Sequence, residues 1–254
     1  MKKLLNYLRY WFCINPSWSK CRKASCWFGS NASTRIMNIL SPNFSDRQFK
    51  DRVKMAADRG VDTFHVFLTN KGDGEGAPYS IYGADFHQAR GVDKASAELM
   101  DRRIRHLRKQ GYGVVLWLMA DDSSAWSKTI DLDLYCHDIA DLGWFDLAST
   151  VVVGLEADEY WNAASVQAAV AAVRKRYKGK VGVHMTSGKT SFASLVDVFF
   201  YQTSPGKTAS QIASETKKAL KCGKPVNFFE LSRGPDRALA QAALDAGAYG
   251  VGNW

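Results

Sequence analysis

Two glutamates, each at the end of a largely apolar run, are the residues of this chain best suited to chemistry. Glu156 follows the β-branched run 151–153, and Glu230 closes the run 226–229. Runs of this composition are typical of buried strands. A carboxylate at the tip of a buried strand is costly unless a site uses it. We therefore expect the fold to bring Glu156 and Glu230 together.

Two carboxylates in one pocket divide acid–base and nucleophilic work between them. Burial and mutual repulsion push their pKa values apart, so one stays ionised while the other holds a proton at neutral pH. The ionised group is then a nucleophile, and the protonated group is a general acid. For Glu156 and Glu230 the competing interpretation is a buried ion pair with arginine.

The elements that position these glutamates alternate along the chain. Apolar runs predict eight strands, at 35–40, 61–68, 113–119, the run that ends at Glu156, 181–185, 196–202, 226–230 and 249–254. Helical patterns lie between them, and turn or cap signals bound several of these helices. Ser45 and Gln48 form a capping box for the first helix, and Asn162 caps a later one. This alternation predicts an α/β fold, a single (β/α)8 TIM barrel.

The chain of 254 residues has no linker that divides it, so we expect one barrel domain over 34–254. A doubly wound sheet competes, but residues 41–44 are not the Gly-rich phosphate turn expected after its first strand. No helix follows the eighth predicted strand, so the barrel is expected to lack a C-terminal eighth helix. The segment 1–33 is basic, and its beginning is amphipathic. Apolar residues recur there at helical spacing and are expected to cover the gap, namely Leu4, Leu5, Leu8, Trp11 and Phe12.

The loops that follow the strands of a barrel build its site. Polar and aromatic residues gather at these tips: Asp121, Asp122, Glu156, Asp158, Glu159, Trp161, His184, Tyr201, Gln202, Glu230 and Trp254. Glycines two residues before Glu156, His184 and Trp254 share a strand face with them, and we assign these faces to the interior. His65 lies in the middle of a predicted strand and is expected to be a core residue.

Glu at the end of strand four, Glu at the end of strand seven, Tyr near the end of strand six and Trp at the end of strand eight resemble the clan A glycoside hydrolases. The resemblance implies a retaining glycosidase in which Glu156 is the acid/base and Glu230 the nucleophile. It further implies that Tyr201 hydrogen-bonds the nucleophile and that Trp254 is a sugar platform. The remaining tip residues, Gln202, His184, Asp121, Asp122, Asp158, Glu159 and Trp161, are expected to contact substrate.

One position departs from the clan. These enzymes usually have Asn before the acid/base Glu, and this chain has Leu155 there. The acidic residues Asp158 and Glu159 are the alternates to Glu156. A lysozyme- or chitinase-like hydrolase would use this strand-four acidic cluster.

Three stretches, 37–42, 154–162 and 250–254, are similar to barrel proteins encoded by bacteriophages and prophages. The implied substrate is a bacterial surface glycan or peptidoglycan. The alternative is a non-catalytic carbohydrate-binding or structural barrel of a phage particle, with a partner in that particle. This likeness implies synthesis in the cytoplasm of a bacterial host, with virion association or release at lysis.

Composition and charge limit the classes of partner and cofactor that this chain is expected to bind. The net charge is +9, but six basic residues and no acid fall in the first 30 positions. We interpret this as a solvated basic end and expect no nucleic-acid partner. An odd count of five cysteines favours reduced thiols. No apolar run is long enough to span a membrane. No motif predicts a metal or a cofactor, and the loop 70–90 is expected to be a flexible rim over a carbohydrate cleft.

Overall fold

The computed structural model describes residues 38–58, 61–70, 78–119, 129–186, 190–204, 206–230 and 237–252, with the backbone alone at 229, 230 and 237. The predicted N-terminal helix, the lead-in to residue 33, Asp121, Asp122 and Trp254 lie outside the described residues. The proposed boundary between 1–33 and 34–254 therefore stays a prediction.

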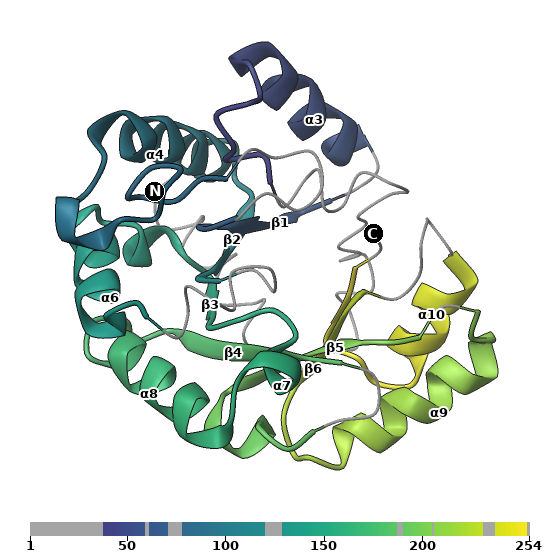
Figure 1. Cartoon of the computed structure of the whole chain (residues 1–254). Coiled ribbons are helices and arrows are strands. Elements are labelled where there is room, and N and C mark those ends of the chain that lie inside the picture. The colour runs from purple at the N-terminus through teal and green to yellow at the C-terminus, as the bar shows by residue number, and fades with distance from the viewer. Residues whose placement is uncertain are drawn as a thin grey trace, which may run out of the picture.

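The described chain forms one curled parallel sheet. Its seven strands follow one another in sequence order and all six neighbouring pairs are parallel. Figure 1 shows the strands curving around a common centre, with the longer helices outside and the short α7 (Ala157–Tyr160) inward of them. The strands are β1 (Thr63–Phe67), β2 (Gly113–Trp117), β3 (Thr150–Val152), β4 (Lys180–Met185), β5 (Val198–Gln202), β6 (Val226–Glu230) and β7 (Gly250–Val251).

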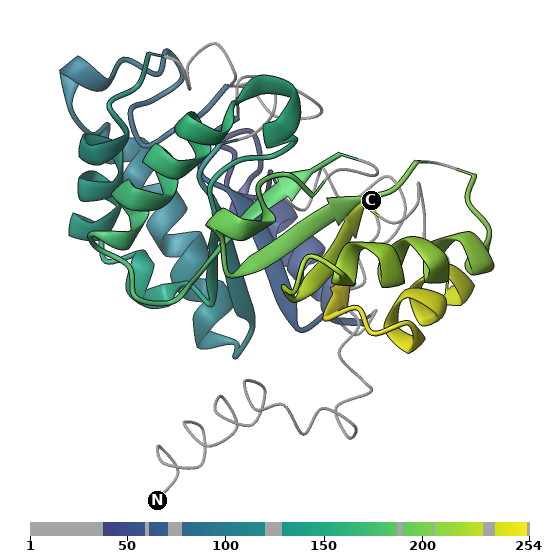
Figure 2. The same ribbon diagram turned by 90° about the horizontal axis from the view of Figure 1, so that it is seen from below.

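Helices connect the strands on the outer side. Seven α-helices are described, namely α3 (Asp46–Asp58), α4 (Lys94–Lys109), α6 (Leu132–Asp141), α7 (Ala157–Tyr160), α8 (Ala163–Arg174), α9 (Ala209–Leu220) and α10 (Arg237–Asp245). Short 3-10 turns lie at Gln88–Arg90, Phe145–Leu147 and Ala193–Leu195. In Figure 2 the teal helices cover one half of the sheet, and α9 and α10 cover the other half. None of the described helices is long and apolar enough to cross a membrane.

The predicted fold class is confirmed, with one difference among the strands. Seven of the eight predicted strands are present. Apart from β3 and β7, which are short, they begin and end within three residues of the predicted bounds. The predicted first strand falls partly outside the described residues, and its residues 38–40 form a turn. Here the backbone N–H of Ser41 bonds to the carbonyl of Asn38 at 2.8 Å, so a local turn replaces the pairing that a strand would need.

Local capping fixes the predicted helix starts. Ser45 and Gln48 form the expected capping box, because each side chain accepts a hydrogen bond from the other residue's backbone N–H, at 3.2 and 2.8 Å. Asn162 caps α8 by accepting from the Ser165 N–H at 2.9 Å. These contacts satisfy backbone donors that a helix start leaves unpaired.

The inner face of the sheet holds a tight aromatic cluster. Trp117 lies 5.8 Å from His65, 5.6 Å from His184 and 5.4 Å from Phe200, measured between ring centroids. These residues come from β1, β2, β4 and β5, so they meet across the interior of the curl. All four are buried, which confirms His65 as a core residue.

Glycines make room for this cluster. A Cβ atom on Gly182 would lie 2.6 Å from the Phe200 ring, and one on Gly250 would lie 2.9 Å from the Asn227 amide. Only glycine fits beside such neighbours without a shift. The assignment of the Gly182 face of β4 to the interior is therefore confirmed.

A buried arginine ties the segment before α3 to the next helix. Arg103 of α4 is only 1% exposed, and its guanidinium donates to the carbonyl oxygens of Ile39 at 2.8 Å, Ser41 at 2.6 Å and Phe44. Burial lowers the pKa of this guanidinium, and the three carbonyls compensate for the water that it has lost.

Candidate active site

Four strands deliver the candidate site residues to one end of the sheet. Glu156 follows β3, His184 lies near the end of β4, and Gln202 and Glu230 end β5 and β6. All these strands are parallel, so their carboxyl ends meet at the same rim. In barrels of this kind the rim at the carboxyl ends carries the active site.

Glu156 has an unusual backbone. Its φ of 44° and ψ of 42° place it in the left-handed region, where residues other than glycine are uncommon. Its side chain is half-buried, and the residue is the N-cap of the short helix α7. The turn at Glu156 therefore leads from the short segment after β3, which ends at Val152, into α7.

His184 clasps this turn from the neighbouring strand. Its Nδ1 accepts a hydrogen bond from the backbone N–H of Glu156 at 2.9 Å, and the backbone N–H of His184 donates to the Gly154 carbonyl at 3.2 Å. Burial lowers the pKa of His184 to about 3. The ring is therefore neutral at ordinary pH, and because Nδ1 is an acceptor, Nε2 carries the proton.

The two alternate carboxylates have different surroundings. Both oxygens of Asp158 accept hydrogen bonds from Thr186, from its N–H at 2.9 Å and from its hydroxyl at 2.7 Å. Asp158 thereby fastens α7 to the end of β4. Glu159 is exposed to solvent on the same helix.

Trp161 lies above the end of β3. Its ring would be 3.5 Å from a Cβ atom on Gly154, and the side chain is half-buried. The space that Gly154 provides is thus occupied by the outer edge of this indole ring. The expected contact of Trp161 with a ligand stays a prediction.

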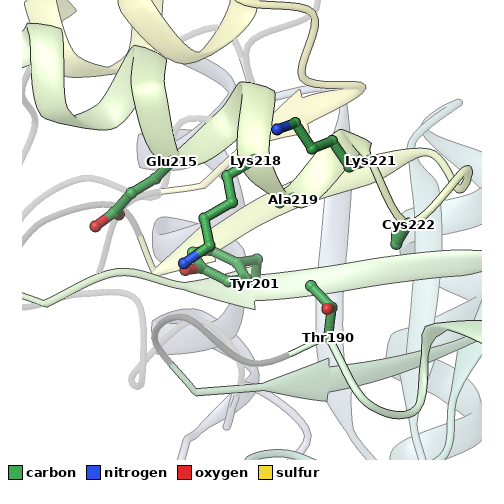
Figure 3. A pocket seen from close by; sticks show the side chains of 7 residues that line it. All are labelled: Thr190, Tyr201, Glu215, Lys218, Ala219, Lys221 and Cys222. Atoms are coloured by element: carbon green, nitrogen blue, oxygen red, sulfur yellow. The ribbon is translucent and has the colours of Figure 1, made fainter.

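Tyr201 and Gln202, which were both expected at the site, lie on opposite faces of β5. Tyr201 is buried against Phe228, with a ring distance of 5.1 Å. It also lines a cavity of about 230 Å³ beside α9, together with Thr190 and Lys218. Figure 3 shows Lys218 reaching from α9 toward Tyr201. Tyr201 thus packs on the α9 side of β5, and its expected contact with the nucleophile stays a prediction.

Gln202 lies on the inner face of β5, as alternation from Phe200 requires. Its Oε1 is buried and has no hydrogen-bond partner in the described part of the chain. The pairing of β5 with β6 shifts by one residue after Tyr201, so Gln202 is paired with Glu230. Without this bulge the partner of Gln202 would be Phe229.

Sequence reasoning missed Thr186 at this rim. Thr186 belongs to no motif, and its position just after a strand was the one signal that could have found it. Tyr79 and Tyr82, which were expected in a flexible rim, are buried at 1% and 3% exposure. Their hydroxyls donate to the Phe67 carbonyl at 3.1 Å and to Asp138 at 2.8 Å. The stretch that contains them is consequently part of the packed wall.

Within the described ranges no group of three or more His, Cys, Asp or Glu residues is arranged to hold a metal ion. The two cysteines that the structure describes, Cys136 and Cys222, are free thiols. The described rim offers carboxylates, an imidazole, an amide and an aromatic ring.

No protein-family model and no curated protein matches the sequence. The structure is nevertheless similar to several solved structures. A GH113 β-1,4-mannanase matches with a TM-score of 0.52 and 15% identity over 81% of both chains. A family 5 glycoside hydrolase from Bacteroides vulgatus matches at 0.60 and 14%, over 83% of this chain and 55% of its own.

The β-glycosidase from Thermosphaera aggregans gives a TM-score of 0.58 at 10% identity, over 81% of this chain and 75% of the other. The chain thus spans about half the length of the family 5 protein and most of the other two. At these identities the similarity establishes the fold. This chain has an α/β fold like that of TIM-barrel glycoside hydrolases.

Proposed function

We propose that this protein is a retaining glycoside hydrolase in which Glu156 is the acid/base and Glu230 the nucleophile. The observation that supports this most is the placement of both glutamates at the carboxyl ends of β3 and β6, on one rim of a curled parallel sheet. A fold shared with glycoside hydrolases supports the same assignment. A bacterial surface glycan or peptidoglycan is the proposed substrate class.

The reaction follows from the two roles. Ionised Glu230 attacks the anomeric carbon while Glu156 donates its proton to the leaving oxygen, which breaks the glycosidic bond and forms a glycosyl ester. Glu156, now ionised, takes a proton from a water molecule as the oxygen of that water attacks the anomeric carbon and breaks its bond to the Glu230 carboxylate. This step releases the sugar with its original anomeric configuration, restores the Glu230 carboxylate and leaves Glu156 protonated.

Glu156 fits the acid/base role better than its alternates. Asp158 uses both oxygens to hold Thr186, and Glu159 is directed to solvent. Glu156 is half-buried at the rim, and its backbone is fixed by His184. A fixed, half-buried carboxyl group is suited to holding a proton at neutral pH.

The other predicted contacts are assigned within the same proposal. Trp161 supplies an aromatic face at the rim, and Trp254 is proposed as a second platform. Asp121 and Asp122 are proposed as polar contacts to the sugar. Trp161 stacks on the apolar face of a sugar ring, as aromatic side chains commonly bury apolar surface with a specific geometry.

Hydrolysis of a panel of bacterial glycans by the wild type, Glu156→Gln and Glu230→Gln tests the proposal. Each variant is expected to keep the fold and to lower turnover by about two to four orders of magnitude, because each removes a proton-transfer or covalent role. Azide should restore part of the activity where a small nucleophile replaces the missing function. Glu159→Gln is the matched control, because its carboxylate is exposed to solvent and is not one of the two proposed catalytic groups.

Proton NMR of the first product settles the stereochemistry. Retention requires carboxyl groups about 5 Å apart, and inversion requires about 6.5–9.5 Å. An inverted product, or full activity in both Glu→Gln variants, would refute the assignment. Loss of activity in Asp158→Asn with an active Glu156→Gln would instead favour a lysozyme- or chitinase-like mechanism.

A second candidate is a non-catalytic carbohydrate-binding or structural barrel of a phage particle. Leu155 favours it, since this buried apolar side chain stands where clan A enzymes usually hold the sugar with Asn. In this case the protein would bind glycans without cleaving them and would be recovered with virions. Synthesis in a bacterial host, with virion association or release at lysis, is proposed on either account.

A further inference from the structure

Gln202 is a rim residue with a buried amide oxygen that no residue in the described ranges hydrogen-bonds. Phe200 packs against His65 at 5.6 Å and Trp117 at 5.4 Å, so its face of β5 is the inner face. Gln202 follows two residues later and shares that face. Tyr201, between them, lies in the outer wall against α9 (Figure 3).

The Gln202 amide oxygen is buried without a donor. Its Oε1 accepts no hydrogen bond from any residue in the described ranges, although buried polar atoms are almost always paired. The cost of such an atom is removed when a ligand supplies the missing donor. The side chain as a whole is half-buried, so it is reachable from the rim.

The neighbours of Gln202 locate the ligand group that it would meet. The β-bulge pairs Gln202 with Glu230, the proposed nucleophile that attacks the anomeric carbon. The sugar substituent nearest to that reaction centre is the one on the adjacent ring carbon. Leu155 has no polar atom with which to bind this substituent, so the contact needs another residue.

We propose that Gln202 recognises a hydrogen-bond donor on the ring carbon next to the anomeric carbon. The donor is the O–H of a neutral sugar or the N–H of an acetamido sugar, and this assignment rests on the proposed function. Gln202 is thus a specificity residue that takes over the contact left open by Leu155. The bulge between β5 and β6 is what pairs its backbone with that of Glu230.

Binding measurements test this without turnover. Glu156→Gln is titrated by NMR or calorimetry with an aryl glucoside, its 2-deoxy analogue and the matching aryl N-acetylglucosaminide. We expect the deoxy sugar to bind about tenfold to a hundredfold more weakly than whichever of the other two binds best. In Glu156→Gln/Gln202→Met this discrimination should fall to about twofold or less.

Gln167→Leu on the exposed face of α8 is the control for losing a glutamine, and Gln202→Leu is the second variant if Gln202→Met does not fold. Discrimination that survives in the folded Gln202 variants overturns the proposal, as does binding of none of the three sugars. If discrimination depends on Gln202 but the protein hydrolyses no glycan, the role of Gln202 is upheld and the proposed catalysis is overturned. If the protein hydrolyses glycans but discrimination does not depend on Gln202, the proposed catalysis is upheld and the role of Gln202 is overturned.

Discussion

The backbone N–H of Glu156 donates to Nδ1 of His184 at 2.9 Å, and this bond joins the proposed acid/base to the core of the sheet. The His184 ring is fully buried and lies 5.6 Å from Trp117. Glu156 has a left-handed backbone, which costs free energy in a residue with a side chain. A rigid buried acceptor offsets this cost and fixes the start of the Glu156 side chain.

His184→Phe should impair catalysis more than binding. The phenyl ring keeps most of the packing against Trp117 but offers no acceptor to the Glu156 N–H. The carboxyl group then loses its fixed position, and we expect kcat to fall about tenfold to a hundredfold with little change in KM. Steady-state kinetics on the best substrate of the glycan panel measures this, and His87→Phe at an exposed position is the control. An unchanged kcat in a folded His184→Phe protein would remove the positioning role.

Stability should fall when the pH is lowered below 6.5. Burial, and to a lesser degree the proximity of His184, lowers the pKa of His65 from 6.5 to about 3, and burial lowers that of His184 to about 3 as well. Between these values the unfolded chain binds protons that the folded chain does not. The free energy of unfolding is therefore highest above pH 6.5, as far as these two histidines are concerned. It decreases toward pH 3 by at most about 1.4 kcal/mol per pH unit for each histidine.

Urea unfolding at pH 7 and pH 5 checks this dependence. His65→Gln removes one titrating ring and leaves an amide oxygen that accepts from Trp117 Nε1, which donates to His65 at 3.0 Å in the wild type. The variant should lose about 2 kcal/mol less than the wild type between these pH values. The exposed His87→Gln should behave as the wild type does. Equal losses in His65→Gln and the wild type would show that His65 does not titrate as stated.

Arg103→Met should destabilise the protein much more than Arg102→Met. The first change leaves the buried carbonyls of Ile39, Ser41 and Phe44 without their donor. The second removes an arginine whose side chain is 58% exposed and bonds to Asp46. We expect losses of about 3 kcal/mol and below about 1 kcal/mol. Denaturant unfolding of both proteins at pH 7 gives the comparison, and similar losses would contradict the buried tie.

Gly182→Ala should be costly, whereas Gly154→Ala should be tolerated. A Cβ atom at 182 would lie 2.6 Å from the Phe200 ring and 3.2 Å from the Val198 carbonyl. Because Phe200 is held by His65 and Trp117, it has no free space to move into, and we expect a loss of about 1–3 kcal/mol. At Gly154 the nearest atom would be at an ordinary 3.5 Å. Melting temperatures of the two variants measure the difference, and Phe200→Leu should relieve the defect at 182.

The sequence by itself determined the alternation of strands and helices and the two glutamates at strand ends. Both signals are local. Apolar periodicity and caps such as Ser45 and Asn162 act within a few residues, so they can be identified without knowing which strands pair. The inward glycines followed in the same way, because side chains alternate along a strand.

Only the tertiary structure decided which residues meet. Alternation of side chains cannot say which face of β5 is inside, so the sequence could not decide whether Tyr201 or Gln202 faces the interior. The contacts of Phe200 with His65 and Trp117 show that the face with Gln202 does. The bulge that pairs Gln202 with Glu230 depends on the ladder between β5 and β6. The left-handed turn at Glu156 depends on His184, which is 28 residues away. These relationships arise from strand register and packing between distant segments, so they cannot be predicted from the local pattern of residues.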